Sequence, residues 1–188
     1  MNRTAFLPLF FAAALLLSPL ARAAADTEIQ EINSLYQHTQ YAAALERVNA
    51  YLEKKPDNAQ ARFLKGLILT GQHKNADAID VFTRLNEDFP ELAEPYNNLA
   101  VIYAQQGHYR QAEKALATAV HINPNYAVAE ENLGDIYAKM AGIAYAEVMK
   151  LDGKNATAPA KLALIKELLA PHPATVMENK LNAEPSDK

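Results

Sequence analysis

A 34-residue period constrains this chain more than any other feature of its sequence. Three prolines keep that interval, Pro56, Pro90 and Pro124. So do four alanines, Ala44, Ala78, Ala112 and Ala146, and a third register of small residues, Gly66, Ala100 and Gly134. A unit that cannot bury its apolar face alone must stack on its neighbours. The period therefore predicts an array of similar units packed in a row.

Residues 93–126 form the clearest unit, and they carry two helical patterns. The first pattern places apolar residues at the spacing of one helix face, Tyr96, Leu99, Ala100 and Tyr103. The second pattern does the same with Tyr109, Ala112, Leu116, Ala119 and Val120. Gly107 separates the two patterns, and Pro124 ends the second because proline cannot donate to a helical ladder. The unit is predicted to be a helical hairpin, with Ala100, Ala112 and Ala119 where the helices approach most closely.

This pattern resembles the tetratricopeptide repeat, a 34-residue motif of two helices with leucine, glycine, tyrosine, alanine and proline at fixed places. The match is best in residues 93–126, whereas residues 59–92 depart from it with Arg62 and Lys65 at positions of an aromatic residue and a leucine. The resemblance implies an all-α, right-handed solenoid over residues 26–170. Its repeats would cover about residues 25–58, 59–92 and 93–126, with a degenerate fourth at 127–155.

The fourth unit allows two interpretations, because its apolar spacing continues without a break from Leu133 to Leu151. It is either a hairpin that turns at Ala141-Gly142 or one long helix. The long helix is slightly favoured, since no capping residue or proline interrupts the pattern. Residues 157–170 are predicted to form an amphipathic helix that caps the stack. The polar segment 171–188 is predicted to be disordered.

Residues 1–25 have the layout of a secretory signal peptide. Arg3 precedes an almost wholly apolar run, and the Ala21-Arg22-Ala23 sequence offers a small-residue cleavage site. Cleavage after Ala23 or after Ala25 fits equally well. The apolar run is short for a membrane span. We therefore expect a periplasmic or secreted protein with no membrane span after signal cleavage.

Composition and motifs exclude several classes of function. Loss of Arg3 and Arg22 with the signal lowers the basic count from 18 to 16 against 22 acidic residues, and a formal charge of −6 disfavours nucleic acid. The chain has no cysteine and no phosphate-binding, serine-hydrolase or zinc-protease motif. His38, His73 and His108 recur near the inter-helix turns, too far apart by helix packing distances to share one metal ion. The sequence predicts no catalytic site, no metal and no cofactor.

The resemblance also implies a ligand groove, because the first helices of such repeats line the concave surface. Among the residues at the matching positions, eight are predicted to bind the peptide: Phe63, Leu64, Leu67, Asn97, Asn98, Val101, Asn132 and Asp135. Asn98 and Asn132 share one register, and an amide both donates and accepts hydrogen bonds. The pair is similar to the asparagine ladder of the superhelical glycosyltransferase that adds N-acetylglucosamine to proteins, although asparagine is also common at this place.

Two functions from different classes follow. The first is a non-enzymatic adaptor or scaffold of the bacterial cell envelope that binds a protein or an extended peptide in this groove. The alternative is a structural subunit that self-associates. The sequence identifies neither the partner nor the oligomeric state.

Overall fold

The computed structural model describes residues 19–170, and this part of the chain is built from α-helices with no strand. Its helices follow one another in the order α1 (Pro19–Gln37), α2 (Tyr41–Lys54), α3 (Ala59–Gly71), α4 (Asn75–Asp88), α5 (Ala93–Gln105), α6 (Tyr109–Ile122), α7 (Ala127–Leu151) and α8 (Ala158–Leu168). The predicted 34-residue period reappears as successive helical hairpins. Each helix packs on the next one in the chain.

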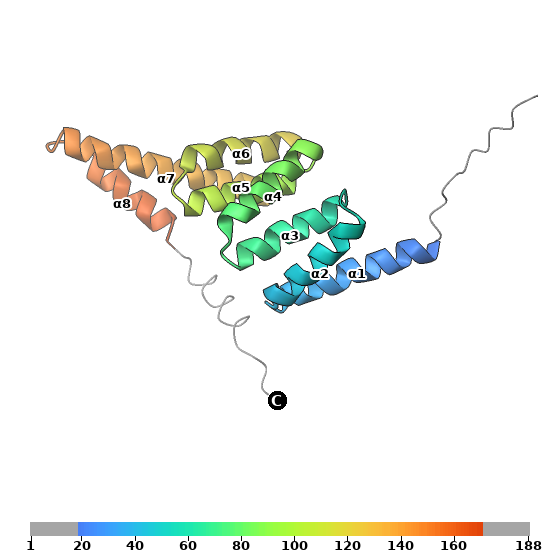
Figure 1. The fold of residues 1–188 in the computed structure, drawn as a ribbon. Coiled ribbons are helices and arrows are strands. Elements are labelled where there is room, and N and C mark those ends of the chain that lie inside the picture. The colour runs from blue at the N-terminus through green and yellow to red at the C-terminus, as the bar shows by residue number, and fades with distance from the viewer. Residues whose placement is uncertain (1–18, 171–188) are drawn as a thin grey trace, which may run out of the picture.

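The hairpins stack in a row as an α-solenoid (Figure 1), which confirms the predicted fold class. The first helices of successive units also touch one another, so that α1, α3, α5 and α7 form one layer of the stack. The second helices α2, α4 and α6 lie on the other side of that layer. This arrangement gives the molecule one surface made mainly by the odd-numbered helices.

Small residues sit where the two helices of a hairpin meet, as the sequence predicts. Ala100, Ala112 and Ala119 are completely buried. In the preceding unit, a Cβ atom added at Gly66 would lie 2.4 Å from Cε1 of Phe82, which itself is completely buried. The glycine in α3 is therefore required by the bulk of the phenylalanine in α4.

The turns inside the hairpins share one backbone conformation. Thr39, His73 and Gly107 all have positive φ angles, of 57°, 59° and 75°, and they lie 34 residues apart. Glycine adopts this left-handed conformation without strain, whereas a β-branched residue such as threonine does not. The stack thus imposes the same turn on three different residues.

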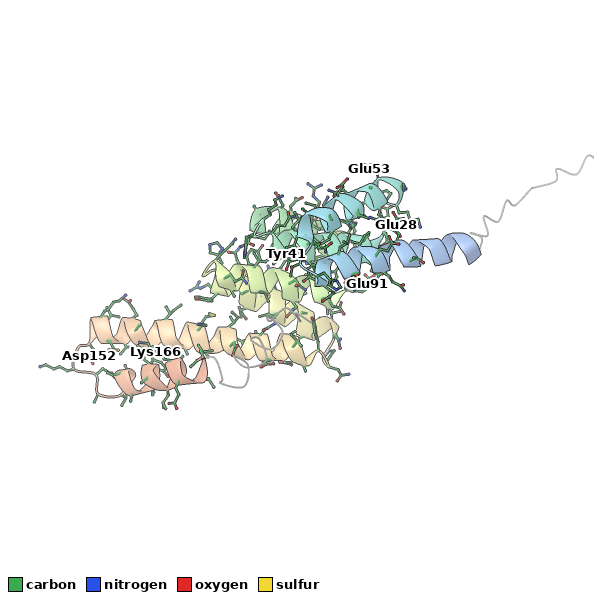
Figure 2. All side chains as sticks on the ribbon, turned by 90° about the horizontal axis from the view of Figure 1, so that it is seen from below. Glu28, Tyr41, Glu53, Glu91, Asp152 and Lys166 are labelled. Carbon is green, nitrogen blue, oxygen red and sulfur yellow. The ribbon has the colours of Figure 1, made fainter. Side chains whose placement is uncertain are left out.

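Residues 127–151 form one continuous helix, which confirms the slightly favoured interpretation of the fourth unit. The glycine at which a turn was conceivable, Gly142, is buried inside α7 instead. A Cβ atom there would lie 3.3 Å from Cγ2 of Ile165 and 3.6 Å from Cδ1 of Leu162, both in α8. α8 packs back on α7 as the predicted capping helix, and the pair projects beyond the stacked hairpins, with Asp152 at its far end (Figure 2).

The N-terminal boundary differs from the expectation. The predicted repeat domain begins at residue 26, whereas α1 begins at Pro19, so its first turns include both predicted cleavage positions. Most of the predicted signal peptide and the whole predicted disordered tail lie outside the described residues. Within residues 19–170, no helix combines the length and the apolar character needed to cross a membrane.

Candidate functional site

Three cavities follow one another along the surface formed by the odd-numbered helices. The first, of about 270 Å³, lies between α1 and α3. The second, of about 400 Å³, lies between α3 and the start of α5, and the third, of about 310 Å³, lies between α5 and α7. A series of this kind gives an extended ligand several points of contact. We refer to the series as the concave groove.

The early half of the concave groove is apolar. Phe63 is half-buried and lines both the first and the second cavity, and its ring centroid lies 5.7 Å from that of Phe82. Leu67 is half-buried at the wall of the first cavity. Leu64 reaches the same wall but is only 5 % exposed and belongs to the core between α1, α2 and α3. The predicted apolar surface is therefore mainly that of Phe63 and Leu67.

The later half is polar, and its central feature is a hydrogen bond between two helices. Nδ2 of Asn132 in α7 donates to Oδ1 of Asn97 in α5 over 2.8 Å. Asn97 is 6 % exposed, so it holds α5 and α7 together rather than facing a ligand. Asn132, Val101 and Asp135, three of the candidate groove residues, all line the third cavity.

Asn98 and Asn132 share one register of the repeat, but they differ in their surroundings. Nδ2 of Asn98 donates to the backbone oxygen of Glu94, one turn back in its own helix, over 2.9 Å. Asn98 does not line the third cavity, and the partner of Asn132 is the preceding residue, Asn97. One residue corresponds to about 100° of rotation around a helix, so the neighbours Asn97 and Asn98 point in different directions from α5.

Further residues reach the third cavity that were not among the predicted site residues. Tyr109 and Leu116 come from α6, and Lys139 comes from α7, one turn after Asp135. The sequence pattern placed Tyr109 and Leu116 on the interior stripe of their hairpin, and they are indeed packed there. Tyr109 is half-buried at the cavity, whereas Leu116 is only 1 % exposed and lines it from the core.

The third cavity has ionisable side chains at its wall and close by. Asp135 and Lys139 are both exposed at the wall of the third cavity. Nearby, burial and, to a smaller extent, the Glu94 carboxylate raise the pKa of Tyr126 above its ordinary value, so its phenol stays neutral at physiological pH. In the described part of the chain, histidines and carboxylates do not gather in threes as a metal site requires.

Fold and groove together define a class, the helical repeat proteins with a concave binding surface. Two sequence models of the tetratricopeptide repeat match this chain, one at residues 29–93 and one at residues 69–136. Together they span more than half of the 188 residues. The chain therefore belongs to the tetratricopeptide repeat family.

Similar proteins come from several settings. A probable UDP-N-acetylglucosamine–peptide N-acetylglucosaminyltransferase SPINDLY from Hordeum vulgare is 28 % identical over 145 residues, which cover 71 % of this chain and only 15 % of that protein. Among solved structures, Pseudomonas aeruginosa pilF superposes with a TM-score of 0.59 at 18 % identity, covering 89 % of this chain and 78 % of its own. YrrB, a tetratricopeptide repeat protein with an unusual peptide-binding site, has a TM-score of 0.54 at 19 % identity and 82 % coverage of each chain. At these identities the likeness to the two structures establishes the fold alone.

Proposed function

We propose that this protein is a non-enzymatic adaptor of the bacterial cell envelope, and that it binds an extended peptide or protein segment in the concave groove. The row of three cavities along α1, α3, α5 and α7 is the observation that carries the proposal. The tetratricopeptide repeat fold suits such a role, because its stacked units create long concave surfaces. The envelope location rests on the sequence of residues 1–25.

The two halves of the groove suggest what the ligand offers. Phe63 and Leu67 provide an apolar wall that would take one hydrophobic anchor. At the other end, Asn132, Asp135 and Lys139 provide an amide and two charges of opposite sign. A segment suited to both ends carries an apolar side chain and, several residues away, polar backbone groups that pair with the amide. Apolar burial would supply most of the affinity.

Photo-crosslinking inside the native envelope tests this proposal. A photoreactive amino acid replaces Val101, which lines the third cavity, or, as a matched control, the exposed Ala117 on α6. We expect a discrete protein adduct from position 101 that is absent from position 117, and mass spectrometry identifies the partner. Equal adducts from both positions, or none from position 101, would contradict binding in the groove.

Self-association is a second candidate, and one observation favours it. Among the described residues, the exposed large apolar side chains all lie on α7 and α8: Val128, Tyr137, Ile143, Met149, Leu151, Leu164 and Leu168. Exposed apolar side chains gathered on two adjoining helices can form an interaction site. If α7 and α8 join copies of the chain, Leu164→Glu with Leu168→Glu converts an oligomer to a monomer in light scattering. A wild-type protein that stays monomeric at high concentration would contradict this candidate.

A further inference from the structure

A separate cavity lies on the opposite side of the α5 layer, between α4 and α6. It encloses about 430 Å³, and none of its lining residues lines the concave groove. Its floor is made by α5, with Tyr96, Leu99 and Tyr103. Its volume is within the range of sites that bind small ligands or single side chains.

Asn86 in α4 lines this cavity and is out of keeping with its surroundings. The residue is 7 % exposed, and its side-chain oxygen is buried with no hydrogen-bond partner among the described residues. Buried polar atoms are nearly always paired, because an unpaired one loses its bonds to water without compensation. The unpaired amide oxygen of a residue that lines a cavity therefore needs an explanation.

The repeat itself shows what this position ordinarily holds in this chain. Leu52 and Val120 occupy the same register, 34 residues before and after Asn86. Both are partly buried and pack against the cores of their own units. The second repeat has thus exchanged an apolar residue for an amide at a buried place, which lowers stability and leaves a hydrogen-bonding group beside a cavity.

We propose that this cavity is a second binding site, and that its ligand is a peptide segment that inserts one large uncharged apolar side chain. The adjoining backbone N–H of that segment donates to Oδ1 of Asn86. A rotation about the Cβ–Cγ bond of Asn86 turns this oxygen toward the cavity.

The rest of the cavity wall fits this ligand. Tyr96, Tyr103 and Leu99 provide aromatic and aliphatic surface on which an apolar side chain packs. The rim carries one acidic and one basic residue, Glu87 and Lys114, so their charges cancel. A rim without net charge does not favour a ligand with a charged side chain. The unpaired amide oxygen, in contrast, favours a ligand that brings an N–H donor.

A pair of small probes tests the site in the full-length protein without a known partner. N-acetyl-L-phenylalanine dimethylamide has a single N–H, and its N-methyl analogue has none. Their dissociation constants are measured from NMR shifts of the ¹⁵N-labelled protein, with wild type compared with Asn86→Leu, which restores the apolar residue found at Leu52. Asn86→Leu should be at least as resistant to urea as wild type, because it removes the unpaired amide.

In wild type, the probe with the N–H should bind about three to ten times more tightly than its methylated analogue, the usual effect of one hydrogen bond. In Asn86→Leu the two probes should bind equally. Ala115→Leu, which fills the cavity from α6 and has Val81 as a larger residue in the same register, should weaken both probes.

The same ratio of affinities in both proteins, or no saturable shift at the cavity residues, would overturn the proposal. If the cavity signals instead change when protein alone is concentrated, the occupant is a second copy of the chain and the peptide assignment is wrong. Asp135→Ala, which changes an exposed side chain in the third cavity of the concave groove, should leave probe binding unchanged. This control separates the present proposal from the adaptor function.

Discussion

At the scale of single residues, the inter-helix turn places non-glycine residues in a backbone conformation that they adopt only with strain. Thr39 has a φ of 57°, in a conformation that costs a non-glycine residue about 1–2 kcal/mol. Gly107 takes the same turn with no atom within 4 Å of an added Cβ, so its role there is purely conformational. The turn therefore offers a stability test that involves no packing.

We predict that Thr39→Gly raises the free energy of unfolding by about 0.5–1 kcal/mol, since relief of the strain exceeds the entropic cost of glycine. Gly107→Ala should lower it by about 1 kcal/mol for the converse reason. Urea titration measures both. A loss of stability in Thr39→Gly would show that the strain assigned to the turn is wrong.

A second residue-scale prediction concerns the contact between α5 and α6. Ala112 is completely buried beside Ala100, so Ala112→Leu should overpack the interface and cost about 1–3 kcal/mol. Ala117 lies on the exposed side of the same helix, and Ala117→Leu should be nearly neutral. Equal urea midpoints for the two variants would contradict the assignment of helix faces.

At the scale of elements, the fourth repeat shows what happens when a hairpin loses its turn. Gly66 and Gly134 share one register, but only Gly66 faces a side chain, that of Phe82 in the returning helix. Gly134 has no atom near an added Cβ, because α7 continues straight and no second helix folds back over it. Gly134 thus keeps the register of Gly66, although no side chain packs against it.

This difference predicts opposite effects of one substitution. Gly134→Ala should stabilise the protein by about 0.5–1 kcal/mol through helix propensity alone. Gly66→Ala should destabilise it by about 1–3 kcal/mol through the clash with Phe82. Thermal unfolding compares the two; destabilisation by Gly134→Ala would mean that residues 127–151 fold back as a hairpin after all.

The elements also show why the fold was predictable and parts of the site were not. The same helix faces recur every 34 residues, so the pattern of each unit supports the prediction for the next one. The continuity of α7 was also visible in the sequence, as an apolar pattern without a break. The Asn97–Asn132 bond depends on the exact rotation of two helices, which no sequence spacing specifies. Asn86 looked like an ordinary polar residue of an amphipathic helix, although comparison with Leu52 and Val120 contained the signal.

Arg62 is a further example at this scale. It stands where the repeat motif has an aromatic residue, and no pattern in the sequence explains this substitution. In the structure its guanidinium lies 2.7 Å from the Asp88 carboxylate and 5.8 Å from the centroid of the Phe89 ring. A long side chain thus covers apolar surface and keeps its charge paired, replacing an aromatic residue by different chemistry.

At the scale of the whole molecule, the proposal of an envelope adaptor depends on export. We predict a mature protein that begins at Ala24 or Asp26, because the Arg3, apolar run and Ala-Arg-Ala order is that of a cleaved signal. N-terminal sequencing of protein purified from its native source checks this. Recovery of Met1 would contradict both cleavage and the expected location.

The central claim is that an apolar anchor in the early half of the concave groove supplies most of the binding energy. The most direct test compares the affinity of the partner identified by crosslinking for the wild-type protein, Phe63→Ala and Asn98→Ala. Phe63→Ala should weaken binding of the purified partner about tenfold or more, since it removes apolar contact area. Asn98→Ala should weaken it threefold at most, because the Asn98 amide is already bonded to Glu94 within its own helix. Urea midpoints confirm that both variants remain folded. Unchanged affinity in Phe63→Ala, with wild-type protein binding the partner, would contradict the account.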